Sequence, residues 1–223
     1  MKAGYIIKHV TGTLVFFLFL FVSAGRINYW QGLIYAGIGL FMVALHYTIL
    51  QPDAALLAER AKPGAGTKSW DKAILGISFL ATMAMYITAG LDSGRFHWSP
   101  VFPVVFVMTG IILTAAGQLL FLIAQKQNKF FSSTVRIQTE REHAVQDTGL
   151  YSMVRHPAYL GSIIQAAGFP LLFGSLWSIL PVSFLIILFF VRTGLEDKTL
   201  LKELPGYPGY AEKTRYRLIP WVW

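Results

Sequence analysis

Long apolar runs constrain this chain more than any other feature. Four of them lie in the first part of the sequence, at residues 10–25, 29–50, 73–91 and 101–124. A helix needs roughly 20 apolar residues to cross the hydrocarbon core of a bilayer, and a shorter run can suffice if its flanks reach the interface. Helices also satisfy their own backbone hydrogen bonds in lipid. We therefore expect an all-α integral membrane protein whose residues 1–124 form a four-helix transmembrane region.

The composition supports a membrane protein and excludes chemistry that depends on cysteine. Hydrophobic residues make up 55% of the chain and charged residues 13%, about half of the charged share of a soluble domain. The sequence has no cysteine. Disulfides, thiolate metal ligands and cysteine nucleophiles are therefore excluded.

Two shorter apolar runs follow at residues 159–173 and 176–191, separated by Gly174 and Ser175. Each run is marginal in length for a separate span. A helical hairpin over residues 158–193, which enters the membrane and returns to the same side, explains this pattern. Two tilted full spans would give the same sidedness, and the sequence leaves both arrangements open.

The basic residues predict the orientation in the membrane. Of the 19 Lys and Arg residues, all except Arg26 and Arg95 fall in segments that these spans place on one side. Such a bias marks the cytoplasmic side. We expect both termini, residues 51–72 and residues 125–158 on the cytoplasmic face of an inner membrane or an endomembrane. The net charge of +8 is then a topology signal, and we expect no nucleic-acid partner.

Two local patterns in the first half predict how its helices connect and pack. Glycines at positions 32, 37 and 39 would let the first two helices approach closely. Residues 54–61 would form a short amphipathic helix, and the Pro63 to Gly66 stretch would end it.

A polar stretch at residues 143–161, HAVQDTGLYSMVRHPAYLG, interrupts the apolar sequence. A residue before proline is pushed away from helical backbone angles, whereas proline suits the first helical turn. His156 should therefore lie at the boundary between loop and helix, and Pro157 should begin the next helix. The amide donors of that first turn would face whatever the loop encloses.

Arg192 and Glu196 lie four residues apart, on one face of a helix that leaves the membrane. The returning hairpin would bring them near Tyr151 and His156. No histidine pair has metal-ligand spacing and no glycine-rich loop suits a phosphate, so we expect no metal. A ligand with an ammonium, a carboxylate and a flat ring would fit these groups. From spacing alone, a purely structural loop is an equally good interpretation.

The ordered motifs narrow this choice. The chain has a His, a Gly-x-Tyr, an Arg-His-Pro-x-Tyr-x-Gly and, after the apolar pair, an Arg-x-x-x-Glu. In this order they resemble the isoprenylcysteine carboxyl methyltransferase family, to which the phospholipid N-methyltransferases are related. The resemblance covers about the last two-fifths of the chain, within the predicted catalytic region at residues 125–223.

The resemblance implies an S-adenosylmethionine-dependent carboxyl (O-) methyltransferase. Its acceptor would be a membrane lipid or a lipidated small molecule with an isoprenylcysteine-like carboxylate. Arg192 would bind this acceptor, and Arg192 and His156 are the candidate catalytic residues. The residues expected to bind the cofactor are His143, Ala144, Val145, Gln146, Tyr151, His156, Pro157, Ala158, Tyr159 and Glu196.

Two alternatives remain at the level of sequence. The ending RYRLIP at residues 215–220 is similar to that of membrane sterol and steroid reductases. An NADPH-dependent reductase of a lipid double bond is therefore an enzymatic alternative. A non-enzymatic membrane scaffold or lipid-binding protein is the other.

Overall fold

The structure is a computed structural model that describes residues 2–51, 54–62 and 65–223. These residues form helices and no strand, so the all-α prediction is confirmed. The helices are α1 (Lys2–Ala24), α2 (Trp30–Leu45), α3 (Ala54–Ala61), α4 (Ser69–Ala89), α5 (Val104–Gln127), α6 (Pro157–Phe173), α7 (Ile179–Glu203) and α8 (Tyr207–Lys213). Short π-helical turns extend α2 over His46–Leu50 and α4 over Gly90–Phe96.

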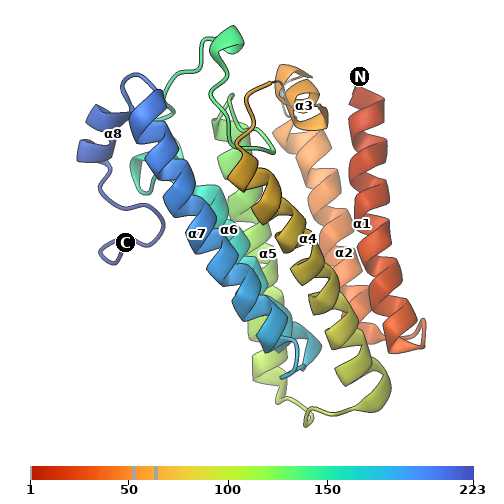
Figure 1. Cartoon of the computed structure of the whole chain (residues 1–223). Helices are drawn as coiled ribbons and strands as arrows, with labels where there is room; N and C mark the ends of the chain where they lie inside the picture. The colour runs from red at the N-terminus through yellow and green to blue at the C-terminus, as the bar shows by residue number, and fades with distance from the viewer. Residues whose placement is uncertain (1, 52–53, 63–64) are drawn as a thin grey trace.

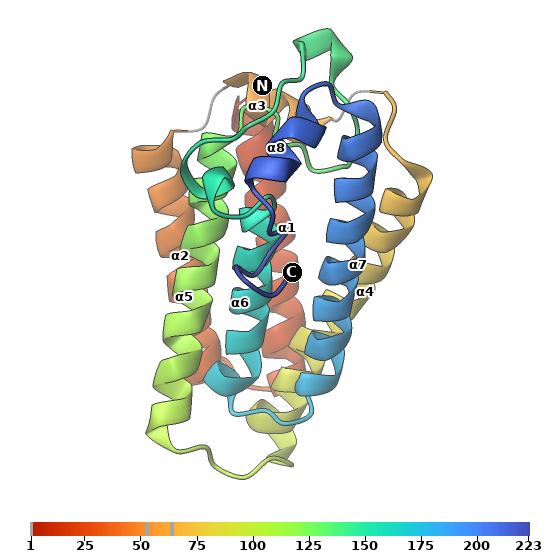
Figure 2. The same cartoon turned by 90° about the vertical axis from the view of Figure 1, so that its left-hand side faces the viewer.

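Six of the helices, α1, α2, α4, α5, α6 and α7, run alongside one another as a bundle (Figure 1). The short helices α3 and α8 and residues 128–156 gather at one end of this bundle, which we call the loop end. The amino terminus lies at the loop end as well. Viewed from the side, α6 lies between α5 and α7 (Figure 2).

Four described helical segments are long and apolar enough to cross a membrane: Trp30–Thr48, Ser69–Phe96, Val104–Gln127 and Ile179–Glu203. Three match predicted spans, and the fourth is α7 rather than the first helix. The apolar part of α1, Val10–Ala24, is shorter than these four, as is Pro157–Phe173. The helix of α7 runs well past the apolar run at 176–191, because its polar residues stay helical as far as Glu203.

The turn between α6 and α7 lies at the end of the bundle opposite the loop end (Figure 2). Gly174 ends α6 with a left-handed backbone, φ 62°, which glycine adopts without strain. Ser175 Oγ then donates a hydrogen bond of 2.6 Å to Asp92 Oδ2, beyond the end of α4. The amide of Leu176 donates to Ser99 Oγ at 2.8 Å. The turn between α6 and α7 therefore lies level with the far ends of α4 and α5, although the apolar helix α6 is shorter than the four candidate spans.

The closest helix packing joins α5 and α6. A Cβ atom on Gly110 would lie 2.2 Å from the Leu172 nitrogen, and one on Gly117 would lie 2.4 Å from the Gln165 nitrogen. Only glycine permits such backbone contact, which is typical of membrane helix pairs. The predicted close packing at Gly37 is wrong, because a Cβ there would meet nothing within 4 Å.

Two loop-end segments support the site. The helix α3 has the predicted bounds, Ala54–Ala61, and buries Leu56 and Leu57. The break expected after it falls partly on residues 63 and 64, which lie outside the described residues. Residues 128–156 form only short 3₁₀ turns, and the carbonyl of Val135 accepts a hydrogen bond from the Lys68 amide at 3.1 Å. The division of the chain at residue 124 and its orientation in a membrane stay predictions.

Candidate active site

A cavity of about 200 Å³ opens at the loop end of the bundle, and we call it the loop-end cavity. Residues from α3, the 128–156 segment, α6, α7 and α8 line it. Of the predicted site residues, those on its wall are His143, Ala144, Val145, Gln146, Tyr151, His156, Ala158, Tyr159, Arg192 and Glu196. Pro157 is buried at the start of α6 and is not part of the wall. The structure thus brings together residues from two distant parts of the sequence.

The start of α6 has the local structure that the sequence predicts. His156 has a non-helical backbone (φ −128°, ψ 61°) and precedes Pro157 in the first helical turn. Its amide donates to the carbonyl of Arg217 at 2.9 Å, and the Arg155 amide donates to the carbonyl of Tyr216 at the same distance. The carboxyl-terminal tail therefore pairs with the loop just before α6.

Asp197 is the most connected side chain of the site, and sequence reasoning gave it no role. It is 0% exposed. The guanidinium of Arg155 binds both of its oxygens, with Nε at 2.8 Å and Nη2 at 2.9 Å. Arg217 Nε donates to Oδ2 at 2.7 Å and the Tyr207 hydroxyl donates to Oδ1 at 2.9 Å. The only sequence signal was its position directly after Glu196, which directs it to another face of α7.

His156 belongs to the same cluster. Its Nε2 atom lies 3.2 Å from Asp197 Oδ1 and 3.4 Å from the Tyr207 hydroxyl. The Tyr207 phenol has a raised pKa because it is buried and adjoins the Asp197 carboxylate. This arrangement holds the imidazole against the wall of the cavity.

Arg192 forms its ion pair with Asp71, in the first turn of α4, rather than with Glu196. Its Nε lies 2.7 Å from Asp71 Oδ1, and Nη2 donates to Oδ2 at 3.3 Å and to the carbonyl of Ser133 at 3.2 Å. Asp71 is fully buried. A buried, two-pronged pair fixes both position and plane of the guanidinium. The sequence did not predict a role for Asp71, because its partner Arg192 lies 121 positions away. The charged residues of the 51–72 segment were used only to predict the orientation in the membrane.

Glu196 faces the cavity one helical turn beyond Arg192. Its Oε2 atom accepts a hydrogen bond of 2.6 Å from the Tyr159 hydroxyl. The Tyr159 ring lies under the Arg192 guanidinium, with 5.3 Å between Cζ and the ring centroid. Among the described residues on the cavity wall, Glu196 is the one carboxylate. Three arginines of the wall are neutralised from outside it, Arg136 by Glu59, Arg155 by Asp197 and Arg192 by Asp71.

Tyr151 and His143 form the part of the wall that comes from the polar stretch. The Tyr151 hydroxyl donates to the carbonyl of Ala124 at 3.3 Å, and burial raises its pKa. The His143 ring packs on Phe130, with 4.6 Å between ring centroids, and its Nδ1 accepts a hydrogen bond from the Gln138 amide. Burial, with help from nearby arginines, lowers the pKa of His143 to about 4. The imidazole is therefore neutral at pH 7.

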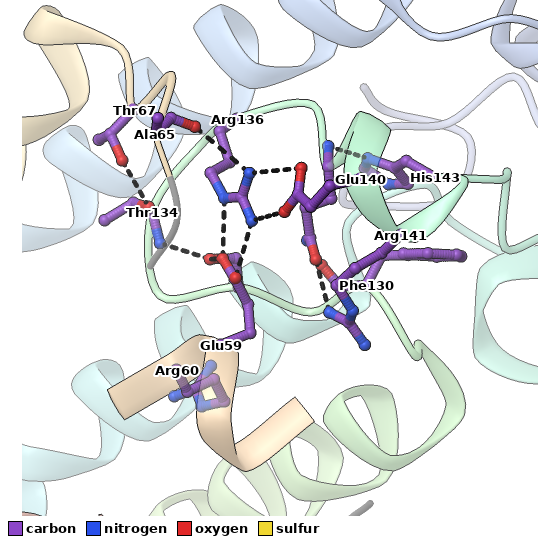
Figure 3. A network of polar contacts seen from close by, with 12 residues as sticks. Glu59, Arg60, Ala65, Thr67, Phe130, Thr134, Arg136, Glu140, Arg141 and His143 are labelled. Atoms are coloured by element: carbon purple, nitrogen blue, oxygen red, sulfur yellow. Dashed lines mark hydrogen bonds and ion pairs between the residues drawn. The ribbon is translucent and has the colours of Figure 1, made fainter. Parts of the chain in front are cut away.

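A polar network around Arg136, which lies on the cavity wall, links α3 to the 128–156 segment (Figure 3). Arg136 donates from Nε to Glu59 Oε1 at 2.9 Å and from Nη2 to Glu59 Oε2 at 2.7 Å. It also binds Glu140 and donates to the carbonyl of Ala65 at 3.3 Å. This buried pair joins α3 to the 128–156 segment, so the first half of the chain helps to hold the loop that lines the site.

No group of three or more His, Asp or Glu side chains in the described parts of the chain has the arrangement of a metal site. The wall of the loop-end cavity offers arginine, tyrosine and histidine side chains and the Glu196 carboxylate.

Comparison with known proteins identifies the same part of the chain. The sequence model of the isoprenylcysteine carboxyl methyltransferase family matches residues 108–202, which run from α5 nearly to the end of α7. Two relatives agree with this match, the protein-S-isoprenylcysteine O-methyltransferases of Saccharomyces cerevisiae and Schizosaccharomyces pombe. Residues 108–202 of this chain are therefore similar to the isoprenylcysteine carboxyl methyltransferase family.

The two relatives cover different lengths. The Saccharomyces cerevisiae protein is 35% identical over 95 residues, which are 42% of this chain and 40% of that protein. The Schizosaccharomyces pombe protein is 29% identical over 164 residues, 65% of this chain and 69% of that protein. The matched part of the first relative is thus less than half of its length. The isoprenylcysteine carboxyl methyltransferase match includes most of the loop-end cavity, and the resemblance read from the motifs is confirmed.

Proposed function

We propose that this protein is an integral membrane methyltransferase that uses S-adenosylmethionine to methylate a carboxylate on a membrane-borne acceptor. The observation that carries the proposal is the charge pattern of the loop-end cavity. Three of the four arginines on its described wall, Arg136, Arg155 and Arg192, have buried acidic partners, and Glu196 is the carboxylate on that wall. Such a cavity suits a ligand that brings its own cation.

The residues of the wall fit S-adenosylmethionine group by group. Glu196 would accept hydrogen bonds from the ammonium, with its geometry set by the Tyr159 hydroxyl. The ring of Tyr151, on the same wall, is the candidate contact for a cationic or flat group. Residues 143–146, which also line the cavity, would cover another side of the bound cofactor. The imidazole of His143 would add no charge there, because it is neutral at pH 7. When bound, S-adenosylmethionine supplies an activated methyl group, and its transfer to a carboxylate gives a methyl ester.

Arg192 would hold the acceptor carboxylate. Its bonds to Asp71 and Ser133 use Nε and Nη2, which leaves Nη1 outside these contacts. A carboxylate acceptor is already ionised at pH 7, so orientation contributes more to its rate than proton transfer would. His156 would act as a positioning residue, because its imidazole is bound to Asp197.

The relatives narrow the class of acceptor. Their names specify the methylation of protein-bound isoprenylcysteine. By analogy, the acceptor here would be a lipid or lipidated molecule with a free carboxylate, which reaches the cavity from the bilayer while the cofactor enters from the cytoplasm. A reductase would bind NADPH in this cavity instead.

Calorimetric titration of the detergent-purified protein with S-adenosylmethionine tests the proposal. Glu196→Gln should weaken binding by about 2 kcal/mol, roughly thirtyfold, because a charge-assisted hydrogen bond is lost. Glu203→Gln is the matched control, since Glu203 lies on the same helix and pairs with Lys68 at the surface. Binding of NADPH, or equal affinity in both variants, would contradict the proposal.

Kinetics of Arg192→Lys test the role of this arginine in methyl transfer. Lysine retains the charge needed by buried Asp71 but loses the planar two-pronged donor. We expect the affinity for S-adenosylmethionine to stay near wild type, while methyl-ester formation on an S-isoprenylcysteine peptide, followed by mass spectrometry, falls at least tenfold. An equal loss of cofactor binding would assign Arg192 to the cofactor instead.

A further inference from the structure

A second cavity of about 220 Å³ lies between α2, α5 and α6, with Arg60 of α3 on its wall. We call it the helix cavity. The residues of its wall that matter below are Arg60, Gln118, Phe121, Gln125, Ser162 and Gln165. The motifs shared with the family do not include these residues.

The wall of the helix cavity is unusually polar for its place among membrane helices. Gln118 and Gln125 lie seven residues apart on one face of α5, about 10 Å along its axis. Ser162 and Gln165 face them from α6. Polar side chains within membrane helices are costly, and they usually mark a site at which a ligand or an ion is bound.

The side-chain amide of Gln125 indicates which ligand group the helix cavity would bind. Its side chain is 2% exposed, and its Nε2 atom makes no hydrogen bond to any part of the chain that the structure describes. A buried amide donor without an acceptor is unfavourable, and lipid hydrocarbon cannot supply one. An oxygen atom of a ligand in the helix cavity would satisfy it.

The two cavities adjoin. Arg60 and Phe121 belong to the walls of both. The Arg60 guanidinium packs on the ring of Phe131, 5.1 Å from its centroid, on the wall of the loop-end cavity. A molecule whose carboxylate lies near Arg192 could therefore continue past Phe121 into the helix cavity.

We infer that the helix cavity binds the part of the acceptor next to its methylated carboxylate, and that this part carries a carbonyl or hydroxyl oxygen that accepts a hydrogen bond from Gln125. The inference rests on the proposed function for the identity of the ligand as the acceptor. Its ligand class is a lipid-like carboxylic acid with a second oxygen near the acid group. An unsubstituted fatty acid would leave Gln125 unsatisfied.

Two probes of equal chain length test the inference, N-dodecanoylglycine and pentadecanoic acid. They differ by one amide group near the carboxylate. Binding to the purified full-length protein is measured by calorimetry without any cofactor. The wild-type protein should bind N-dodecanoylglycine about tenfold more tightly, because one hydrogen bond to a buried donor separates the two ligands.

Gln125→Leu should remove this preference, since it keeps the approximate size of the side chain and deletes the donor. Gln125→Met is the second variant if the first does not fold. Thr109→Val is the matched control, because Thr109 is an exposed α5 residue whose hydroxyl bonds within its own helix. A preference that persists in folded Gln125 variants, or equal binding of both probes to wild type, would overturn the inference.

This experiment separates the inference from the proposed function. If S-adenosylmethionine fails to bind while Gln125→Leu loses the preference for the amide, the helix cavity is an amphiphile site and the methyltransferase proposal falls. If the cofactor binds while the probes show no dependence on Gln125, the proposed function stands and the inference falls.

Discussion

At the scale of single residues, the site is built from side chains whose charges are balanced outside the cavity. Asp71 and Asp197 are both completely buried, and each fixes an arginine of the wall. A buried carboxylate costs much free energy unless it is paired, so these acids and their arginines are required together. The consequence is a wall on which Glu196, among the described residues, is the carboxylate left for a ligand.

The neutral state of His143 leads to a pH-dependent stability. Its pKa is lowered from 6.5 to about 4 in the folded protein. Between these values the unfolded chain binds more protons than the folded one, so stability falls as pH is lowered from 6.5 towards 4. The melting temperature in detergent should therefore decline over this window, and it should decline less in His143→Gln. Identical declines in both proteins would show that other groups cause the effect.

These residues also show the limits of reading the sequence. The polar stretch, its helix start at Pro157 and the pairing of the stretch with Glu196 follow from local patterns and from the ordered motifs. The roles of Asp71 and Asp197 do not, because each pairs with an arginine that is distant in sequence, 121 positions for Asp71 and 42 for Asp197. The unsatisfied amide of Gln125 depends on packing between three helices, which no local pattern encodes.

At the scale of elements, α3 is the part of the first half that reaches the site. Its bounds could be predicted from amphipathic spacing, whereas its contact with the 128–156 segment could not. That contact is the buried pair of Glu59 and Arg136, whose side chains are 6% and 1% exposed. The segment has almost no regular structure, so this pair supplies order that a helix or strand would otherwise provide.

Glu59→Gln should destabilise the protein by about 3 kcal/mol, because it leaves the buried Arg136 charge with only its partly exposed partner Glu140. Replacing both members of the pair, in Glu59→Leu with Arg136→Leu, should recover most of the loss, since no buried charge remains. Melting temperatures of the three proteins provide the measurement. If the double variant is less stable than Glu59→Gln, the pair contributes more than charge compensation.

At the scale of the whole molecule, the bundle has two unlike ends. The loop end carries the cavity and the segments rich in Lys and Arg, whereas the opposite end is closed by hydrogen bonds among Asp92, Ser99 and Ser175. The positive-inside bias then predicts that the loop end faces the cytoplasm. The composition and apolar runs were sufficient for this overall picture, but the position of the turn between α6 and α7 depends on the contacts of that turn.

Labelling of single cysteines tests the orientation, and the absence of native cysteine makes the experiment direct. Cysteines at the exposed positions Ser69 and Asp147, at the loop end, should resist an impermeant maleimide in intact cells. A cysteine at Val101, which is 98% exposed at the opposite end, should react. All three should react after permeabilisation. Labelling at Asp147 in intact cells would place the cavity on the outer side.

The pairing of the tail with the start of α6 has a consequence for the time at which the candidate site forms during synthesis. Arg155 and His156 bind the backbone of residues 214–217, and Arg217 completes the shell of Asp197. The ribosome makes these residues after every helix of the bundle. The membrane helices can thus insert and assemble while the wall of the loop-end cavity is still incomplete, so a nascent chain completes this candidate site only as synthesis of residues 214–217 finishes.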